Sequence, residues 1–377
     1  MRRFRRRVNR RLYRLLFRVY RAAFPAPPAG HGRIPAASLS RILVVRHDRV
    51  GDMIVTTPAL ALLAELAPHA EIDVLASRAN AQVVMTDSGV SRVFVRKGWS
   101  DWLLLFPAMR RRRYDVIYSF IYGRGLREGL IASAIARRET RKFSVMRPAR
   151  YAGLFTAVIR APRSLRHMAD QLMFVVRATI ESPDTRGDER HRMHIAVDAQ
   201  AKRRAAAFVA EHGLSEFVAV NISSAEAWRE WPWENCAKVL RVLLPRWPDL
   251  TFVLTPPPAA EKIRHAEQAI AACASDRVIL CPPSPRFLDL VAVVQRASLV
   301  LTCDTANVHV ASACGCPIIA LYAGIRTTPG LWSPFGVPAR EVRAAPGHAV
   351  STIPAEEIVR ACEELCAQIA QPWSVRV

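Results

Sequence analysis

Short apolar runs alternate with helix-length segments through most of this chain, and this alternation limits its possible folds more than any other feature. The first run is Arg-Ile-Leu-Val-Val at residues 41–45, and a helical pattern follows over 53–66. A short apolar run of this kind is typical of a parallel strand that is buried on both faces. Repeated strand–helix units predict a parallel sheet covered by helices on both sides. The sequence therefore predicts an α/β fold.

The alternation occurs in two series, which predicts two doubly wound, Rossmann-like domains. With 377 residues, the chain is long enough for each domain to bury its own core. A polar stretch at 181–192 separates the series. We expect one domain over 41–190 and the other over 191–377, with a ligand cleft between them. The expected strands lie at 72–75, 93–95, 116–120, 217–221, 251–254, 277–280, 299–302 and 317–322. The expected helices of the second domain lie at 234–244, 260–272, 287–297 and 305–314, with a last one after Pro354.

Basic residues are concentrated at the N-terminus. Lys and Arg number 54 against 32 Asp and Glu, a formal net charge of +22, and no acidic residue precedes Asp48. Residues 1–24 contain ten Arg, and their apolar residues recur at three- and four-residue steps. This pattern predicts a helix with one apolar stripe, typical of a helix lying on an anionic membrane. The alternatives are a disordered basic arm and an arm that binds nucleic acid. Residues 25–40 are rich in Pro and Gly and predict a linker.

The cysteines favour a reduced cytoplasmic protein. All eight lie between Cys236 and Cys366, and no pair of Cys-x-x-Cys motifs occurs. This spacing does not favour a zinc site, so we expect buried thiols and no metal. No segment is apolar enough, for long enough, to span a bilayer.

The loop at 46–52 leaves the carboxyl end of the first strand and enters a helix, where open α/β sheets bind ligands. It lacks Gly-x-Gly-x-x-Gly, so a dinucleotide site is not predicted. Gly51 allows a tight turn. Asp52 is either an N-cap, worth about 1 kcal/mol, or a general base.

A second loop, residues 302–309, follows an apolar run and begins a helix. The free N–H groups of a helix N-terminus and its dipole form an anion site. With Asp304 as the cap, the amides of 305–308 are expected to bind a diphosphate. His309 has two equal interpretations, as a core histidine and as a site residue.

A third loop, residues 221–232, follows the first strand of the second series. Arg229 in this loop has the fork geometry to bind a phosphate oxygen, or it is a surface arginine.

Taken together, these loops resemble glycosyltransferase family 9, which includes the ADP-heptose:lipopolysaccharide heptosyltransferases. The resemblance rests on Val-Gly-Asp-Met-Ile-Val-Thr-Thr-Pro-Ala-Leu at 50–60, Arg-Glu-Trp-Pro at 229–232 and Asp-Thr-Ala-Asn-Val-His-Val-Ala-Ser at 304–312. Gly-Cys-Pro with an apolar run at 315–322, and Trp-Ser-Pro-Phe-Gly at 332–336, complete the ordered set.

The resemblance implies a GT-B fold, with an acceptor-side N-terminal domain and a C-terminal domain that binds the nucleotide sugar. It implies an inverting, metal-independent transfer in which Asp52 is the catalytic base and Gly51 supports its loop. The donor is then ADP-heptose, and the acceptor is the lipopolysaccharide core or a related membrane-linked saccharide. The implied donor-binding residues are Ser223, Ser224, Arg229, Glu261, Asp304, Thr305, Ala306, Asn307, Val308 and His309. The implied location is cytoplasmic and peripheral on the inner membrane, through residues 1–24.

The chain departs from the family pattern at three places. Arg229 replaces the usual Lys, Ala306 replaces a Gly, and residues 255–261 (TPPPAAE) replace Gly-Gly-Pro and an acid. A non-catalytic nucleotide-sugar-binding or membrane-associated protein of the same fold is the alternative function. No specific nucleic-acid partner is expected, because no aromatic-basic platform occurs.

Overall fold

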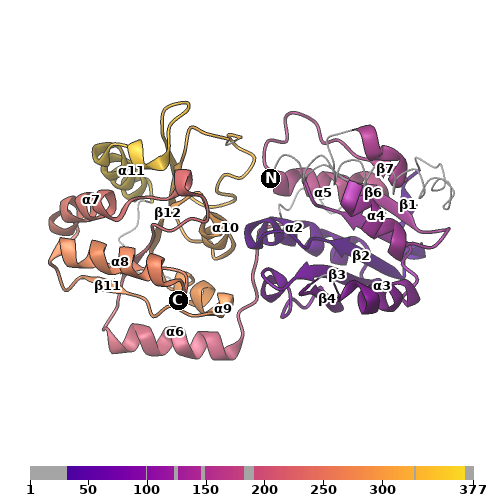
Figure 1. Ribbon diagram of the computed structural model, residues 1–377, viewed down its shortest axis with the longest axis horizontal. Helices are drawn as coiled ribbons and strands as arrows, with labels where there is room; N and C mark the ends of the chain where they lie inside the picture. The colour runs from indigo at the N-terminus through magenta and orange to yellow at the C-terminus, as the bar shows by residue number, and fades with distance from the viewer. Residues whose placement is uncertain are drawn as a thin grey trace. The chain divides into compact units, whose positions relative to one another are not determined.

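The computed structural model describes residues 32–98, 100–122, 126–145, 149–181, 191–326 and 328–369. The predicted basic helix at 1–24 lies outside the described residues, as does most of the polar stretch at 181–192. The chain forms two compact units (Figure 1). The first ends at Arg49 and resumes over Pro58–His191, whereas Val50–Thr57 group with the second unit, which continues from Arg192. The sequence does not predict this grouping of 50–57.

The first unit is built on a six-stranded parallel sheet with the order β4-β3-β2-β5-β6-β7. The central strand β2 (Arg41–Val45) pairs with β3 and β5, and it is buried on both faces, as predicted, because helices cover both faces of the sheet. The other strands are β3 (Glu71–Ser77), β4 (Arg92–Arg96), β5 (Val116–Ser119), β6 (Arg141–Ser144) and β7 (Ala157–Val158). The helices are α2 (Val50–Leu66), α3 (Trp102–Arg111), α4 (Leu126–Ile135) and α5 (Met168–Thr179).

The linker predicted over 25–40 does not extend to residue 40. β1 (Ile34–Pro35) pairs in parallel with β8 (Ile180–Glu181), and Leu39 is buried. The Pro- and Gly-rich composition hides this short strand because its partner lies far away in the sequence. Residues 34–39 therefore belong to the folded body.

Helix α2 begins at Val50, before the predicted start at 53, and contains Pro58. Proline has no N–H, so the carbonyl of Ile54 loses its helical donor. The Thr57 hydroxyl replaces that donor at 2.8 Å, and its oxygen also accepts the His194 amide at 3.0 Å. The Thr-Pro sequence is thus compatible with a continuous helix.

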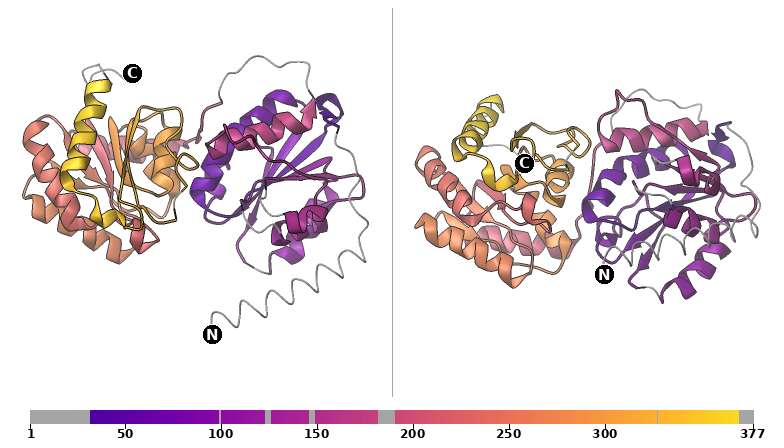
Figure 2. Two further views of the ribbon diagram at one scale, coloured as in Figure 1. Left: turned by 90° about the horizontal axis from the view of Figure 1, so that it is seen from above. Right: turned by 45° about the horizontal axis from the view of Figure 1, so that its top comes forward.

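The second unit repeats the topology of the first. Its parallel sheet has the order β11-β10-β9-β12-β13-β14, which is the doubly wound order 3-2-1-4-5-6 when strands are numbered within the sheet. Its strands are β9 (Phe217–Asn221), β10 (Thr251–Leu254), β11 (Val278–Leu280), β12 (Leu299–Cys303), β13 (Ile318–Tyr322) and β14 (Ala339–Arg343). Its helices are α6 (Ala199–Glu211), α7 (Trp233–Arg246), α8 (Ala260–Cys273), α9 (Phe287–Val294), α10 (Ala306–Ala313) and α11 (Ala355–Gln368). Figure 2 shows helices on both faces of each sheet.

The cysteines contribute to the core of the second unit. All eight are free, and six are buried, which confirms their expected role as small core residues. Burial raises the pKa of the Cys303 thiol to about 12, so this thiol stays protonated at neutral pH. Within the described part of the chain, no helix has the length and apolar character to cross a bilayer.

Candidate functional site

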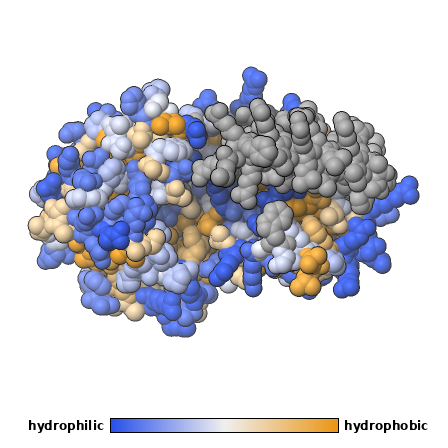
Figure 3. Space-filling view, viewed as in Figure 1, coloured by the Kyte–Doolittle hydropathy of each residue, from blue (hydrophilic) through white to orange (hydrophobic). Residues whose placement is uncertain are grey.

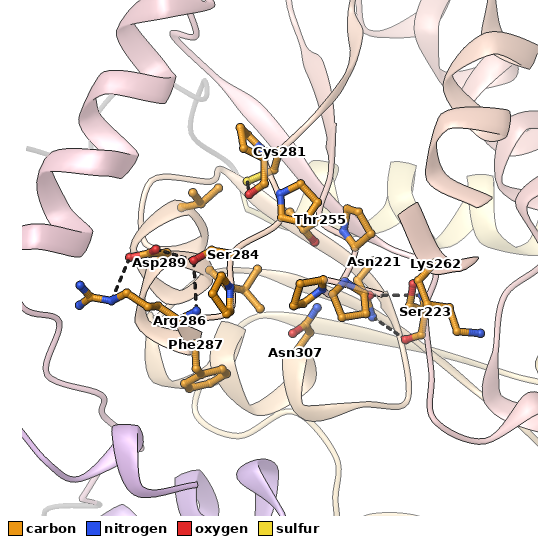
Figure 4. A pocket seen from close by; sticks show the side chains of 18 of the residues that line it. Asn221, Ser223, Thr255, Lys262, Cys281, Ser284, Arg286, Phe287, Asp289 and Asn307 are labelled. Atoms are coloured by element: carbon orange, nitrogen blue, oxygen red, sulfur yellow. Dashed lines mark hydrogen bonds and ion pairs between the residues drawn. The ribbon is translucent and has the colours of Figure 1, made fainter. Parts of the chain in front are cut away.

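The carboxyl ends of four neighbouring strands of the second unit, β9 to β12, lead to a cavity of about 1010 Å³ (Figure 4). The cavity lies beside β9 and β12, where the strand order reverses and the loops of a parallel sheet diverge. The lining residues come from the four strand-end segments 221–225, 255–262, 281–293 and 305–307, from helix α6 and from Val50. Of the predicted donor-binding residues, those that line it are Ser223, Ser224, Thr305, Ala306 and Asn307.

Asn221, the last residue of β9, joins two of these loops. Its Nδ2 donates to Thr302 Oγ1 at 3.0 Å and to Thr305 Oγ1 at 3.2 Å. Its Oδ1 accepts the Ser223 amide at 3.2 Å. The start of α10 is therefore fixed relative to the loop after β9.

The start of α10 differs from the prediction in its cap. The N-cap is Thr305, whose Oγ1 accepts the Asn307 amide at 3.3 Å, so the expected cap by Asp304 is wrong. The Val308 amide donates to the Thr305 carbonyl at 3.2 Å and is not available to a ligand. No hydrogen bond joins the amides of Thr305 and Ala306 to another described residue. An anion site at this helix therefore has two unbonded amides instead of the four expected.

Asp304 instead pairs with Arg229. Their Oδ2 and Nε atoms are 3.4 Å apart, and the Arg229 guanidinium lies 4.4 Å from the centre of the Trp228 ring. These contacts hold the guanidinium in place through an ion pair and a cation–π contact. Neither Arg229 nor Asp304 lines the cavity itself.

The loop after β10 supplies Thr255, three consecutive prolines and Lys262 to the cavity. Lys262 Nζ donates to both carboxylate oxygens of Glu230 at 2.8 Å. Glu261, the predicted donor contact, is largely exposed and does not line the cavity. Lys262 faces the cavity and Glu261 does not, because neighbouring residues on a helix such as α8 point about 100° apart.

The loop after β11 forms another wall, which the sequence did not predict. Three prolines at 282, 283 and 285 and Phe287 line it. Ser284 Oγ donates to Asp289 Oδ2 at 2.6 Å (Figure 4). Arg204 Nη1 donates to the same oxygen at 2.7 Å. The sequence feature that could have predicted this wall is the position of the loop, directly after the expected strand at 277–280.

Gly51, in the first turn of α2, is required by close packing. A Cβ at this position would lie 2.9 Å from His309 Cδ2, which is too short for an ordinary contact, and 3.4 Å from the Ala306 Cα. The predicted reason, a tight turn, is wrong because Gly51 lies within the helix. His309 is buried on α10, with its ring 6.2 Å from that of Trp332, and it does not line the cavity.

Asp52 is half-buried in the first turn of α2. The N-cap of this helix is Arg49, so the interpretation of Asp52 as an N-cap is wrong.

The first unit carries a basic cluster, Arg46, His47, Arg96 and Arg127, near the carboxyl ends of β2 and β4. Arg46 and His47 are buried, and His47 Nε2 and Arg96 Nε make no hydrogen bond to the described residues. Burial lowers the pKa of His47 to about 4, and the charge of Arg127 contributes to this lowering. His47 is therefore neutral at physiological pH. Arg46 forms an ion pair with Asp48 at 3.4 Å, so Arg96 and Arg127 make this edge positive.

Comparison with solved structures defines the type of fold. A glycosyltransferase family 9 structure from Veillonella parvula matches with a TM-score of 0.73 and 21% identity, over 87% of this chain and 97% of that one. An Escherichia coli heptosyltransferase with ADP-2-deoxy-2-fluoro heptose matches with a TM-score of 0.65 and 20% identity, over 88% of this chain and 100% of that one. The fold is thus the GT-B type, as predicted, with Rossmann-like parallel sheets.

Sequence comparison identifies the family. The sequence model of glycosyltransferase family 9 (heptosyltransferase) matches residues 102–357. Lipopolysaccharide heptosyltransferase 3 of Escherichia coli (strain K12) is 23% identical over 347 residues, which cover 85% of this chain and 96% of that protein. The chain belongs to glycosyltransferase family 9 and is a glycosyltransferase, which confirms the resemblance.

Proposed function

We propose that this enzyme transfers heptose from ADP-heptose to the lipopolysaccharide core or a related membrane-linked saccharide. The names of its relatives support the substrates: one is a lipopolysaccharide heptosyltransferase, and another was solved with an ADP-heptose analogue. The observation that carries the proposal is the cavity at the start of α10, where two amides have no partner among the described residues.

The donor diphosphate is proposed to bind at this helix start. The amides of Thr305 and Ala306 are suited to phosphate oxygens, and the dipole of α10 favours negative charge there. The side chains of Ser223, Ser224 and Asn307 line the same cavity and supply further hydrogen bonds. Arg229, held by Asp304, provides positive charge for the leaving diphosphate.

The nucleoside is proposed to lie against the proline walls at 256–258 and 282–285. Proline rings and Phe287 offer flat apolar surfaces without N–H groups, which suits the face of a base. Lys262, whose charge is balanced by Glu230, is available for a hydroxyl or phosphate oxygen.

Asp52 is proposed to act as the catalytic base. Its carboxylate takes the proton of the acceptor hydroxyl while that oxygen attacks the anomeric carbon. The bond from this carbon to the diphosphate oxygen breaks, and ADP leaves with the bonding electron pair. One displacement inverts the anomeric configuration. The helix amides and Arg229 offset the charge that develops on ADP, so a metal is not required.

The acceptor is proposed to bind at the basic cluster of the first unit. Arg96 and Arg127, beside a neutral, buried His47, suit the phosphate or carboxylate groups of an anionic saccharide. Residues 1–24 are proposed to bind the anionic face of the inner membrane, which would keep the enzyme near a membrane-linked acceptor.

Release of ADP from ADP-heptose, with an inner-core lipopolysaccharide acceptor, tests the proposal. We expect Asp52→Asn to lower kcat by about 10²–10⁴-fold, the usual contribution of a general base. ADP should stabilise the variant and the native chain equally, by about 2.7 kcal/mol at 100 times Kd. Full activity of Asp52→Asn would refute the role of Asp52. Binding of ADP-heptose without turnover on any core acceptor would refute the proposed acceptor.

A further inference from the structure

Helix α3 (Trp102–Arg111) has an inner face that is already well packed. Trp102 and Met109 are buried in the core of the first unit, and Leu105 and Phe106 pack against them. The rings of Trp102 and Phe106 are stacked with centroids 4.6 Å apart. These inner-face contacts are what holds α3 on the first unit.

The outer face carries two large hydrophobic side chains that packing does not explain. Leu103 and Leu104 are each 79% exposed. Of the residues that the structure describes, the other exposed large hydrophobics are Met85 and Val242, which are separate from each other in the sequence. Single exposed hydrophobics are common on protein surfaces, whereas adjacent ones of this exposure indicate an interaction site.

The surroundings of these leucines are basic. Residues 96–113 contain six Arg or Lys and one acidic residue, Asp101, whose carboxylate accepts the amides of Lys97 and Gly98. Arg112 is ion-paired with Glu71 and Asp73, and the other five basic residues leave this segment with a positive charge.

Arg110 and Arg111 are at the other end of α3, and both are exposed. Arg110 Nη1 donates to the carbonyls of Ala134 and Ala136, so Arg111 is the better placed of the two to contact a headgroup. In Figure 3 a hydrophobic patch bordered by hydrophilic side chains lies at the lower right, where Figure 1 draws α3.

We propose that α3 is a membrane-docking element that inserts Leu103 and Leu104 into an anionic lipid surface. Leu104 and Arg111 are seven residues apart, about 10 Å along a helix. This spacing fits a helix whose apolar end enters the acyl boundary by about 5–10 Å, while its arginines contact phosphate headgroups. Anionic lipid headgroups carry the negative charge that attracts the arginines at the end of α3.

A second copy of this chain fits the surface less well. If two α3 helices packed in parallel, Arg110 and Arg111 would face their own copies. If they packed antiparallel, these arginines would cover the leucines of the other copy and lose water without gaining a counter-charge. Anionic lipid suits both ends of the helix, because its acyl chains can bury the leucines and its headgroups can pair with the arginines.

Cosedimentation with vesicles tests the inference, using the full chain with residues 1–31 intact. Vesicles of phosphatidylcholine with about 30% phosphatidylglycerol, which present an anionic surface, are compared with pure phosphatidylcholine. We expect Leu103→Gln/Leu104→Gln to weaken binding to the anionic vesicles at least tenfold. Met85→Gln, an exposed hydrophobic of the same unit, is the matched control and should bind like the native chain. Unchanged circular dichroism and ADP binding would show that the double variant is folded.

An environment-sensitive fluorophore at Leu104→Cys separates α3 from the N-terminal arm. We expect a blue shift and quenching by spin-labelled lipid at this position when the chain binds vesicles, and neither at Arg203→Cys, which is exposed on α6. A bound chain without a shift at position 104 would overturn the proposal. So would a concentration-dependent dimer that the double variant dissociates, without vesicle binding. Neither measurement requires a sugar donor, so its outcome is independent of the proposed transfer reaction.

Discussion

At the scale of single residues, His47 is the clearest case of a side chain whose chemistry depends on burial. Its pKa is lowered to about 4 in the folded chain, against about 6.5 in an unfolded one. Between these values the unfolded chain binds a proton that the folded chain does not. The contribution of neutral His47 to the free energy of unfolding is therefore fully present above pH 6.5 and is lost as the pH falls toward 4.

This pH dependence can be measured with His47→Asn. Between pH 7.5 and 5.0, the native chain should lose about 2 kcal/mol more of its free energy of unfolding than the variant, since one pKa unit corresponds to about 1.4 kcal/mol. Urea unfolding at both values provides the comparison. Equal losses in the two proteins would mean that His47 is protonated, or already accessible, in the folded chain.

The sequence predicted the residue types of the site better than their contacts. Five of the donor-binding candidates line the cavity, because residues that follow parallel strands meet at one edge of a sheet. Lys262 was missed, since its contact with Glu230 depends on how α8 lies beside the loop after β9. The close packing of Gly51 could not be predicted, because its neighbours, Ala306 and His309, come from a distant part of the sequence.

At the scale of elements, the same residue, Thr305, stabilises helix α10 and lies at the proposed diphosphate site. The Thr305 hydroxyl oxygen caps the helix by accepting the Asn307 amide, and it also accepts a hydrogen bond from Asn221 Nδ2. Thr305→Val removes this oxygen but keeps the shape of the side chain. It should lower the free energy of unfolding by about 1 kcal/mol, the usual cost of a lost cap.

The same substitution should weaken ADP binding by roughly tenfold, or about 1.4 kcal/mol, because the amides that bind the diphosphate lose the Thr305 Oγ1 contacts with Asn307 and Asn221 that hold the start of α10 in place. Calorimetric titration with ADP gives this value. Thr305→Ser retains the oxygen and should bind ADP like the native chain. If Thr305→Val also binds ADP normally, the helix start is not where the diphosphate lies.

The predicted strands were most accurate where apolar residues are continuous. β9 and β10 match their predicted ranges of 217–221 and 251–254, since a strand buried on both faces has a strong apolar signal. β14 (Ala339–Arg343) was missed because it is an edge strand with charged residues. β6 was missed because it contains Lys142, which is buried and donates to Ser133 Oγ at 2.9 Å. Edge position and such buried pairs depend on the tertiary fold.

At the scale of the whole molecule, the charge is unevenly distributed between the N-terminus and the folded units. The net charge is +22, and ten Arg fall within residues 1–24. Many arginines of the folded units have acidic partners, such as Arg112 with Asp73 and Arg286 with Asp198. Long-range attraction to anionic surfaces should therefore arise mostly from the N-terminal arginines.

Salt should separate the two proposed membrane contacts. The Debye length falls from about 10 Å at 0.1 M salt to about 3 Å at 1 M, so attraction by the arm is screened, whereas burial of Leu103 and Leu104 is not. We expect vesicle binding by the native chain to weaken with salt and then level off. A full chain with its ten N-terminal arginines replaced by glutamine should lose most of the salt dependence but keep the residual binding. Leu103→Gln/Leu104→Gln should show the reverse, with binding that disappears at 1 M salt. If the arginine variant also loses its residual binding, α3 does not insert on its own, and the arm is the principal membrane contact.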